Sequence, residues 1–407
     1  MIILISYYYP PELSAGAFRS IDLSRSILNY NNYKSGKLVV LTAKEYRHNQ
    51  NINYEVLPNE NSNIKIIRVK VPFKGGGLLK GLFNYICFFV IGFVKVLPYK
   101  PMLIFSTSGR LGTNFLAFII ANFKKSKLIL DVRDVFSLNL RRLIFNKKKY
   151  ISKILFKFFI TIEKYIYFRA DHVNVVSPYF LKLYNKLGFH TENWSTYTNG
   201  IDSQYLQNFK LKFDKQNINK NKIILYAGNI GDGQKLDIFL KDFSTNLPLD
   251  WKFLIVGNGS RKKYIVHLIN KHKLHNVILK KPVTRTELAN LYNQASVLLV
   301  SLGQELCLSY VIPSKIFEYG TYNKPILAGV RGFTSNFIKK ELPLVKIFRP
   351  GDGLDGAKGL QELIELDLDK KSINELNIKK INFMSKFNRE KLSDKFIEDI
   401  FKEKLFD

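Results

Sequence analysis

Cysteine is scarce in this chain, and so are the patterns that metal sites and redox cofactors require. Among 407 residues only Cys87 and Cys307 are cysteines, which excludes a disulfide framework or a cysteine-built zinc site and favours a reducing, cytoplasmic location. No GxGxxG loop is present, so the nicotinamide and flavin fingerprint is absent. No histidine or carboxylate cluster has metal-ligand spacing, and we expect neither a metal nor a cofactor.

Acidic residues are also few. The chain has 63 Lys and Arg against 33 Asp and Glu, a formal charge of +30. This excess predicts an anionic partner, which could be nucleic acid, an anionic membrane or a phosphorylated substrate. Helix-turn-helix, zinc and RNP patterns are missing and the aromatic residues sit in apolar runs, so we expect no nucleic-acid partner.

Long hydrophobic runs are missing as well. Residues 78–97 are apolar but are interrupted by Lys80, Asn84 and Lys95. The uninterrupted part, Tyr85–Val94, is about half of the roughly 20 residues that span a bilayer. The segment therefore predicts interfacial insertion or a buried helix.

A basic, aromatic-rich stretch follows in residues 141–169, with nine Lys or Arg and one Glu. Each basic residue near anionic lipid contributes about 1 kcal/mol, and aromatic side chains anchor at the interface. The stretch predicts peripheral association with the inner face of the plasma membrane. The alternative is a solvated basic face.

Short apolar, β-branched runs alternate with helix-compatible stretches through the chain, which is typical of parallel sheets covered on both faces. The pattern restarts after the polar stretch 202–222, so we expect two doubly wound α/β domains with a cleft between them. The strand candidates are Ile2–Ser6, Leu38–Thr42, Ile64–Val69, Leu103–Ser106, Lys127–Asp131, His172–Ser177, Ile223–Ala227, Lys252–Val256, Asn276–Lys280, Val297–Ser301, Pro325–Val330 and Leu344–Ile347.

Glycine-containing loops follow the first strand of each predicted domain. One loop ends at Gly16, where a helix begins near Ala17, and the other runs from Gly228 to Lys235. Such loops at helix starts are natural anion cradles, and Lys235 could meet a phosphate. The alternative is an ordinary tight strand-to-helix turn.

Polar residues end the strand at 127–131. Asp131, Arg133 and Asp134 form either a strand-end salt bridge or a polar lining of the acceptor side of the cleft. The sequence leaves both open.

The segment Pro313–Gly320 combines an anion site with a carboxylate. Proline at a helix start, with Ser314 and Lys315 in the first turn, leaves backbone N–H groups that suit a diphosphate. Glu318 follows one turn later and could accept hydrogen bonds from a diol. Together they describe a nucleotide sugar, the alternative being an ordinary helix–strand unit with a solvated glutamate.

The ordered set of motifs resembles family 4 retaining glycosyltransferases, nearest to the bacterial O-antigen and capsule enzymes of the N-acetylfucosamine transferase type. The resemblance covers nearly the whole chain. The motifs that carry it are Tyr8–Glu12 with Gly16, Asp131–Asp134, Asn199–Asp202, Tyr226–Gly231, Val256–Gly259 and Pro313–Tyr319.

The resemblance implies a GT-B fold of two Rossmann-like domains. Residues 1–201, joined by a C-terminal helix at 388–407, would bind the acceptor and the membrane, and residues 202–387 the donor. It implies metal-independent, retaining transfer of a hexosyl group, such as an N-acetylated deoxyhexose or hexosamine, from a UDP-type nucleotide sugar. The acceptor would be a polyprenyl-diphosphate-linked saccharide or a polysaccharide, in cell-surface polysaccharide synthesis.

The resemblance also implies site residues. Glu318 would bind the ribose, and Asp134, Tyr310 and Glu318 form the candidate catalytic set. Tyr310 stands where the family has a sugar-binding glutamate, Asn229 replaces an arginine, and either Gln234 or Lys235 matches the family's lysine. The candidate substrate-binding residues are Gly16, Arg133, Gly228, Asn229, Gln234, Lys235, Gly257, Ser314, Lys315 and Glu318.

Two other functions stay open. A sugar-nucleotide epimerase can share this fold but needs an acid/base pair around the sugar, which the sequence does not offer. A catalytically degenerate subunit that scaffolds an active partner is suggested by Tyr310.

Overall fold

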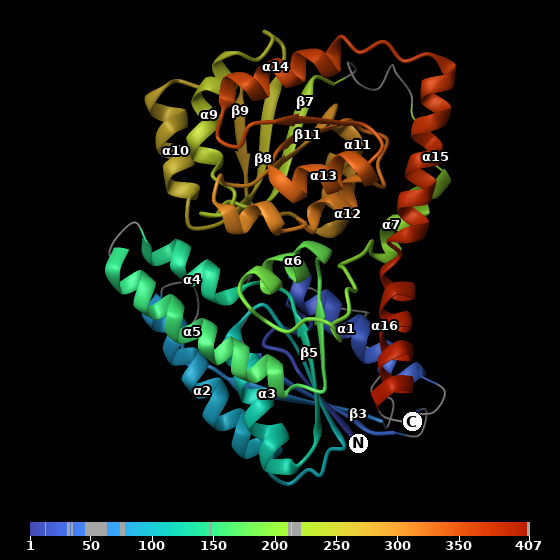
Figure 1. The fold of residues 1–407 in the computed structure, drawn as a ribbon. Coiled ribbons are helices and arrows are strands. Elements are labelled where there is room, and N and C mark those ends of the chain that lie inside the picture. The colour runs from blue at the N-terminus through green and yellow to red at the C-terminus, as the bar shows by residue number, and fades with distance from the viewer. Residues whose placement is uncertain are drawn as a thin grey trace. The chain divides into compact units, whose positions relative to one another are not determined.

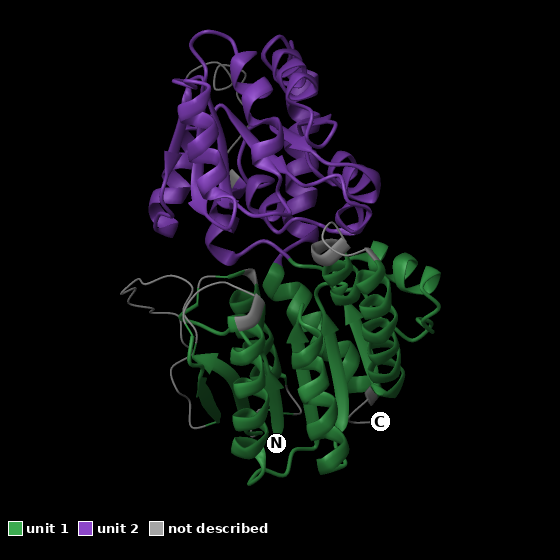
Figure 2. Ribbon diagram, turned by 90° about the vertical axis from the view of Figure 1, so that its left-hand side faces the viewer, with its two compact units in different colours: residues 1–199, 389–407 green, residues 200–388 purple. Residues whose placement is uncertain are grey.

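The computed structural model describes residues 1–12, 14–30, 33, 36–44, 63–73, 78–145, 149–210, 213 and 221–404. The chain divides into two compact units (Figure 2): unit 1 is residues 1–199 with 389–407, and unit 2 is residues 200–388. The expected ranges differ from these units only at residues 200, 201 and 388. Part of the expected linker 202–222, residues 211–212 and 214–220, lies outside the described residues.

Unit 1 is built on a six-stranded parallel sheet with the order β3-β2-β1-β4-β5-β6. The central strand β1 is completely buried, and it pairs with β2 on one side and β4 on the other, with Ile2 opposite Leu38 and Leu103. The strands are β1 (Ile2–Ile5), β2 (Leu38–Lys44), β3 (Ile64–Lys70), β4 (Leu103–Ser108), β5 (Lys127–Val132) and β6 (His172–Val175).

Helices cover both faces of this sheet (Figure 1). One face carries α2, α3 and α5, which contact one another through α3, and the opposite face carries α1 and α16. The helices of unit 1 are α1 (Ala15–Asn29), α2 (Leu78–Val96), α3 (Leu111–Lys124), α4 (Phe136–Phe145), α5 (Lys149–Arg169), α6 (Pro178–Lys186) and α16 (Arg389–Lys404).

The helix α16 supplies part of the core of unit 1, although it follows all of unit 2 in sequence. Its apolar side chains Phe396, Ile397, Ile400 and Phe401 are buried with residues of β1, β2, β4 and α1. Ser26 on α1 donates a hydrogen bond of 2.6 Å to a carboxylate of α16. Unit 1 is therefore completed by the C-terminal residues.

Unit 2 has a second six-stranded parallel sheet, with the order β12-β11-β10-β7-β8-β9. Counted from its own first strand this is the arrangement of unit 1, with the order reversing between β7 and β10. The strands are β7 (Ile223–Asn229), β8 (Lys252–Asn258), β9 (Val277–Lys280), β10 (Val297–Ser301), β11 (Ile326–Gly329) and β12 (Val345–Phe348).

The helices of unit 2 vary widely in length. They are α7 (Ser203–Leu206), η2 (Gln207–Lys210), α9 (Leu236–Thr245), α10 (Lys262–Lys271), α11 (Arg285–Gln294), η3 (Leu306–Tyr310), α12 (Lys315–Tyr319), α13 (Gly332–Glu341), α14 (Gly353–Ile364) and α15 (Lys370–Lys386).

The sequence predicted the twelve strands found among the described residues and their parallel arrangement, and the fold class is confirmed. The bounds differ by one or two residues, because continuous apolar runs mark a buried strand but not where its last ladder hydrogen bond falls. The helix α1 begins at Ala15, earlier than expected, with Ser14 accepting a hydrogen bond from the amide of Ala17. Within the described ranges, no helix has the length and apolar content needed to cross a bilayer.

Candidate functional site

The candidate residues of unit 2 gather beyond the carboxyl ends of β7 and β10, where the strand order reverses and ligands of such sheets bind. Two hydrogen bonds tie the loops that follow these strands. The amide of Gly303 donates to the carbonyl of Gly233 at 2.8 Å, and the Ser301 hydroxyl donates to the carbonyl of Gln234 at 2.7 Å. The loops therefore form one connected rim.

Gly228 and Gly257 lie side by side at the ends of β7 and β8. A Cβ atom on Gly257 would fall 1.9 Å from the carbonyl oxygen of Gly228, which is far inside van der Waals contact. Gly257 is therefore required for the two backbones to approach. Direct contact of either glycine with a substrate remains a prediction.

The short helix α12 presents Lys315 and Glu318 while its other side chains are buried. Ile316, Phe317 and Tyr319 are at most 1% exposed, whereas the Glu318 side chain is 24% exposed. This one-sided burial fixes the helix and leaves the two charged groups accessible.

One oxygen of Glu318 accepts every side-chain hydrogen bond that the described residues donate to this carboxylate. Oε2 accepts from the Tyr292 hydroxyl at 2.8 Å, from Lys315 Nζ at 2.9 Å and from the Tyr205 hydroxyl at 3.5 Å. Among the described residues, none donates to Oε1. The arrangement orients the carboxylate and leaves one oxygen available to a ligand.

Both tyrosines act as donors in this cluster. Burial, with the negative charge of Glu318 beside it, raises the pKa of Tyr292 well above its usual value, and the same two causes raise the pKa of Tyr205. Their hydroxyls stay protonated throughout the physiological range and keep donating to the carboxylate.

Lys315 reaches from α12 toward the end of β7. Its Cε atom lies 3.9 Å from the position that a Cβ on Gly228 would take, and its ammonium contacts the Tyr292 hydroxyl at 3.2 Å. Ser314 precedes it as the N-cap residue, and its side chain makes no capping hydrogen bond. The structure thus brings together four predicted residues: Gly228, Ser314, Lys315 and Glu318.

The other candidate substrate-binding residues of unit 2 lie at the end of β7 and in the loop after it, where their side chains contact other groups of the protein. Asn229 Nδ2 donates to Gln234 Oε1 at 3.1 Å, and Lys235 Nζ pairs with Asp232 at 3.0 Å and with Glu305 at 3.6 Å. Burial opposes ionisation of Asp232, but its bonds from Arg261 and Lys235 hold its pKa below the usual value. Lys235 is therefore neutralised within the protein, and which of Gln234 and Lys235 meets a phosphate remains a prediction.

Tyr310 ends η3 and is only 5% exposed. Its ring packs against Phe333 of α13, with centroids 5.0 Å apart. Tyr310 therefore packs between η3 and α13, and its part in catalysis stays a prediction.

For the polar residues at the end of β5 in unit 1, the sequence left open a salt bridge or a polar lining of the acceptor side. The structure shows a salt bridge for one of them. Asp131 is fully buried and forms a salt bridge with Arg19, whose two nitrogens lie 2.7 and 2.9 Å from its oxygens, and Thr107 and Asn174 also donate to it. Burial opposes ionisation of Asp131, but Arg19 and these donors hold its pKa below the usual value. Asp131 is thus the strand-end salt bridge.

Arg133 lies beside the first turn of α1 instead. A Cβ atom on Gly16 would lie 2.8 Å from its Nη1, and its Nε is buried with no hydrogen-bond partner among the described residues. Burial lowers the pKa of Arg133 to about 10. Asp134 adjoins it, with Oδ1 accepting from the amide of Val135 at 3.1 Å. Arg133 therefore holds its guanidinium beside Gly16 at the start of α1, with the charges of Asp131 and Asp134 acting on it.

Sequence reasoning missed Tyr292 and Tyr205. They contact Glu318 from α11 and α7, which are separated from it by 26 and 113 residues. No local spacing links these positions, since only the tertiary fold brings them together. In the described part of the chain, no group of three or more His, Cys, Asp or Glu residues could hold a metal ion.

Residues 208–380 match the family described as Glycosyl transferases group 1. This match covers most of unit 2 and includes β7 through α14, with α12 among them. A comparison with curated protein sequences finds no match to the chain.

Solved structures share the fold over nearly the whole chain. HepE of Anabaena, in complex with UDP and glucose, gives a TM-score of 0.65 at 14% identity and covers 98% of this chain and 99% of that one. Sucrose-phosphate synthase of Thermosynechococcus elongatus gives 0.69 at 15% identity, covering 99% and 98%. WaaG, a glycosyltransferase involved in lipopolysaccharide biosynthesis, gives 0.66 at 12% identity, covering 98% and 99%. The expected GT-B fold is thereby confirmed.

Proposed function

Residues 208–380 match the glycosyl transferases group 1 family and the chain has a GT-B fold, and from this premise we propose a retaining glycosyltransferase that uses a nucleotide-sugar donor. The reaction breaks the bond between the anomeric carbon and the donor diphosphate and joins that carbon to an acceptor hydroxyl. We propose that the acceptor hydroxyl attacks from the face that the diphosphate leaves and gives its proton to that diphosphate, so the product keeps the donor's anomeric configuration.

The observation that carries the proposal is the state of Glu318. Oε2 is held by Tyr292, Lys315 and Tyr205, whereas Oε1 has no donor among the described residues. A carboxylate oxygen that is oriented and free suits the two hydroxyls of a ribose, because hydrogen bonds to a charged acceptor contribute about 1.5–3 kcal/mol. The adjoining start of α12 and Lys315 would then meet the diphosphate.

Charge on the leaving diphosphate is the largest electrostatic demand of this chemistry. Lys315 is the cation we assign to it in unit 2. Arg133, beside Gly16 in unit 1, is a separate candidate for binding a phosphate, because its buried Nε has no hydrogen-bond partner among the described residues. Asp134 adjoins it and is our candidate for orienting the acceptor hydroxyl.

Binding of UDP by calorimetry tests the donor site. Glu318→Ala should weaken UDP affinity at least about ten-fold, since one charged hydrogen bond contributes about 1.5–3 kcal/mol. Glu375→Ala on α15, an exposed carboxylate of the same unit, is the matched control and should bind UDP as the native protein does. Unchanged affinity in Glu318→Ala would refute the ribose assignment.

Activity of the isolated chain separates the competing functions. We expect mass spectrometry to detect transfer from UDP-N-acetylhexosamines, including deoxy sugars, to a polyprenyl-diphosphate-linked saccharide, with retention of configuration by NMR. A new nucleotide sugar formed without acceptor would favour an epimerase. Normal UDP binding without transfer to any extracted lipid acceptor would favour a scaffold subunit.

Association with the inner face of the plasma membrane is part of the proposal. A band of exposed apolar side chains, here called the apolar face, lies over the adjacent helices α2, α3 and α5. Such an area on one face is typical of an interaction surface, and the basic residues of α5 would favour anionic lipid. The apolar face consists of Leu82, Phe83, Ile86, Val90, Ile91, Val94, Phe115, Phe123, Tyr150, Ile151, Ile154, Phe158, Tyr165 and Phe168.

A further inference from the structure

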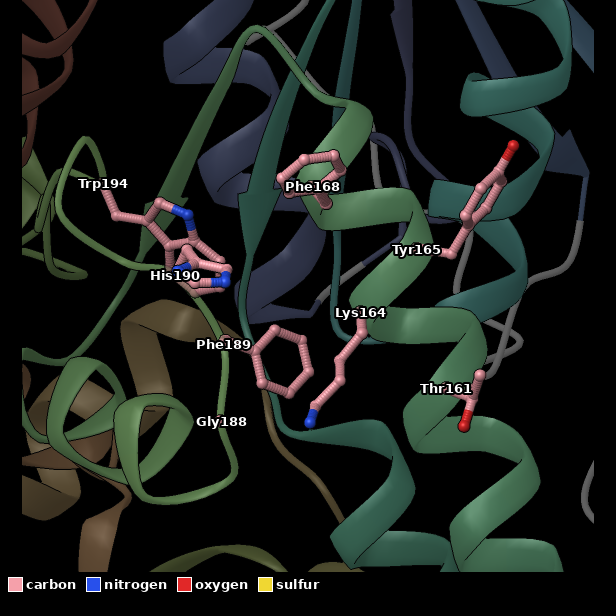
Figure 3. A pocket seen from close by; sticks show the side chains of 8 residues that line it. All are labelled: Thr161, Lys164, Tyr165, Phe168, Gly188, Phe189, His190 and Trp194. Atoms are coloured by element: carbon pink, nitrogen blue, oxygen red, sulfur yellow. The ribbon is translucent and has the colours of Figure 1, made fainter.

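An open pocket of about 370 Å³ lies in unit 1 between the second half of α5 and the segment that follows α6 (Figure 3). It contains none of the candidate substrate residues. α5 runs from the carboxyl edge of the sheet, after β5, to the amino edge, before β6. The pocket therefore lies toward the sheet edge opposite Arg133 and Asp134.

Aromatic side chains form most of the pocket. Phe168 is 73% exposed and Tyr165 53% exposed, which leaves large apolar surfaces in water. Opposite them, Trp194 is held by Phe189 and Tyr184, with ring centroids 6.1 and 5.2 Å away. One wall is thus fixed by packing and the other is uncovered, as expected for a site that an apolar ligand completes.

The ammonium group of Lys164 lies over one of these aromatic rings. Lys164 extends from α5 toward Phe189, with its ammonium 5.6 Å from the ring centroid (Figure 3). The nearby backbone is Gly188, where a Cβ atom would come within 3.1 Å of that ammonium. Neither Lys164 nor Arg169, which lies over Tyr165 at 5.5 Å, forms an ion pair within the described chain, and the exposed Glu192 pairs with neither. The pocket therefore joins apolar walls to an uncompensated positive charge.

Tyr165 and Phe168 also belong to the apolar face, so the pocket opens at its edge. Tyr165 contacts Phe118 of α3 with ring centroids 5.6 Å apart, which continues the aromatic surface from α5 to α3. We propose that this pocket binds one anionic phospholipid of the bilayer, with its phosphate at Lys164 and an acyl chain against Phe168 and Trp194. This inference rests on the proposed membrane association. It favours a bilayer lipid over the acceptor, because the pocket lies away from Arg133.

Tryptophan fluorescence gives a direct test, because the chain has only Trp194 and Trp251. Trp251 is 3% exposed in the core of unit 2, so Trp251→Phe leaves Trp194 as the single reporter. We expect vesicles of phosphatidylglycerol brominated on the acyl chains to quench Trp194 strongly. Unbrominated phosphatidylglycerol should leave its intensity unquenched, and brominated phosphatidylcholine should quench it weakly.

Two charge-reversal variants, one in the pocket and one outside it, test whether the pocket itself binds the lipid. In the Trp251→Phe background, Lys164→Glu should abolish most of the quenching and weaken vesicle binding at least about five-fold, since each basic residue contributes about 1 kcal/mol. Lys157→Glu changes the same charge on the exposed surface of α5, so it should weaken vesicle binding by a similar factor, but vesicle-bound protein should retain the quenching.

Equal loss of quenching in both variants, or a vesicle-bound protein whose Trp194 is not quenched, would overturn the phospholipid site while leaving membrane association intact. No vesicle binding by the Trp251→Phe protein would overturn both. UDP binding, measured on the same samples, tests the donor site independently of the lipid site.

Discussion

Glu318 shows how one carboxylate can serve the fold and a ligand at once. Its Oε2 is bound by Tyr292, Tyr205 and Lys315, and these contacts hold the other oxygen in position. The two tyrosines come from separate helices, so the orientation of the carboxylate depends on how α11 and α7 pack.

Removing the Tyr292 hydroxyl should therefore impair binding without touching the ligand. Tyr292→Phe should raise the Kd for UDP by roughly ten-fold, because a hydrogen bond to a charged group contributes about 1.5–3 kcal/mol. Calorimetry measures this change. Tyr205→Phe, whose hydroxyl is 3.5 Å from the same oxygen, should have a smaller effect. Equal UDP affinity in all three proteins would contradict this orienting role.

The buried pair of Arg19 and Asp131 should dominate the stability of unit 1. Arg19→Met leaves Asp131 buried without its charge partner, which costs about 3–5 kcal/mol. Denaturant unfolding followed by circular dichroism should show this loss at neutral pH. Because the pKa of Asp131 is lowered, the native pair keeps its full contribution above the unfolded pKa of about 3.9 and loses it as pH falls through the lower folded value. A loss below 1 kcal/mol would contradict the assignment.

At the scale of elements, helices α4 and α5 are joined by a buried carboxyl. Glu163 of α5 accepts a hydrogen bond of 2.5 Å from Ser137 of α4, and its other oxygen is buried with no partner among the described residues. Burial raises the pKa of Glu163 to about 7. The helix pair that follows Asp134 is thus most stable when this carboxyl is protonated.

This raised pKa has a definite effect on stability. The contribution of Glu163 is fully present below its unfolded pKa of 4.5 and is lost as pH rises through about 7, a change of roughly 3 kcal/mol. Thermal unfolding from pH 4.5 to 8 should therefore show a falling melting temperature. Glu163→Gln keeps an uncharged acceptor for Ser137 and should lack this part of the pH dependence. If the melting temperatures of the native protein and Glu163→Gln changed with pH in the same way, the assigned role of Glu163 would be wrong.

The close approach of the β7 and β8 ends in unit 2 requires that residue 257 have no side chain. Gly257→Ala would place its Cβ 1.9 Å from the carbonyl oxygen of Gly228, so the two loops must separate and UDP affinity should fall together with the melting temperature. Gly81→Ala is the matched control, since nothing lies within 4 Å of a Cβ there, and in α2 it should stabilise by about 0.5–1 kcal/mol. Similar effects of the two substitutions would contradict the close approach.

The sequence predicted helices and strands well, but it did not predict which side chains contact each other over long sequence distances. Runs such as Val297–Ser301 mark buried strands because every residue is apolar or small, and the Pro313–Glu318 spacing marks a helix start with a carboxylate one turn on. Asp131 and Arg133 have the same local context, yet only Asp131 receives a buried partner. Such pairings depend on residues far away in sequence, as Arg19 is from Asp131, and no local pattern encodes them.

At the scale of the whole molecule, unit 1 is held together by residues from both ends of the chain. Phe396→Ala on α16 should cost unit 1 about 3–5 kcal/mol, and hence roughly 10 °C in melting temperature. Trp194 fluorescence in the Trp251→Phe background reports this unit. Ile378→Ala on α15, a side chain 59% exposed, is the control and should change little. An unchanged Trp194 transition in Phe396→Ala would show that α16 does not stabilise the unit.

The return of α16 also sets the order in which this protein can mature on the ribosome. Domains generally fold from the N-terminus as they are synthesised, but here the apolar side chains of β1 and β4 stay uncovered until the codons for residues 389–404 have been read. Unit 2 is translated in full before then. A transcript that ends at the codons for residues 389–395 would yield a chain with an intact second unit and an exposed first core, and we expect quality-control proteases to remove it.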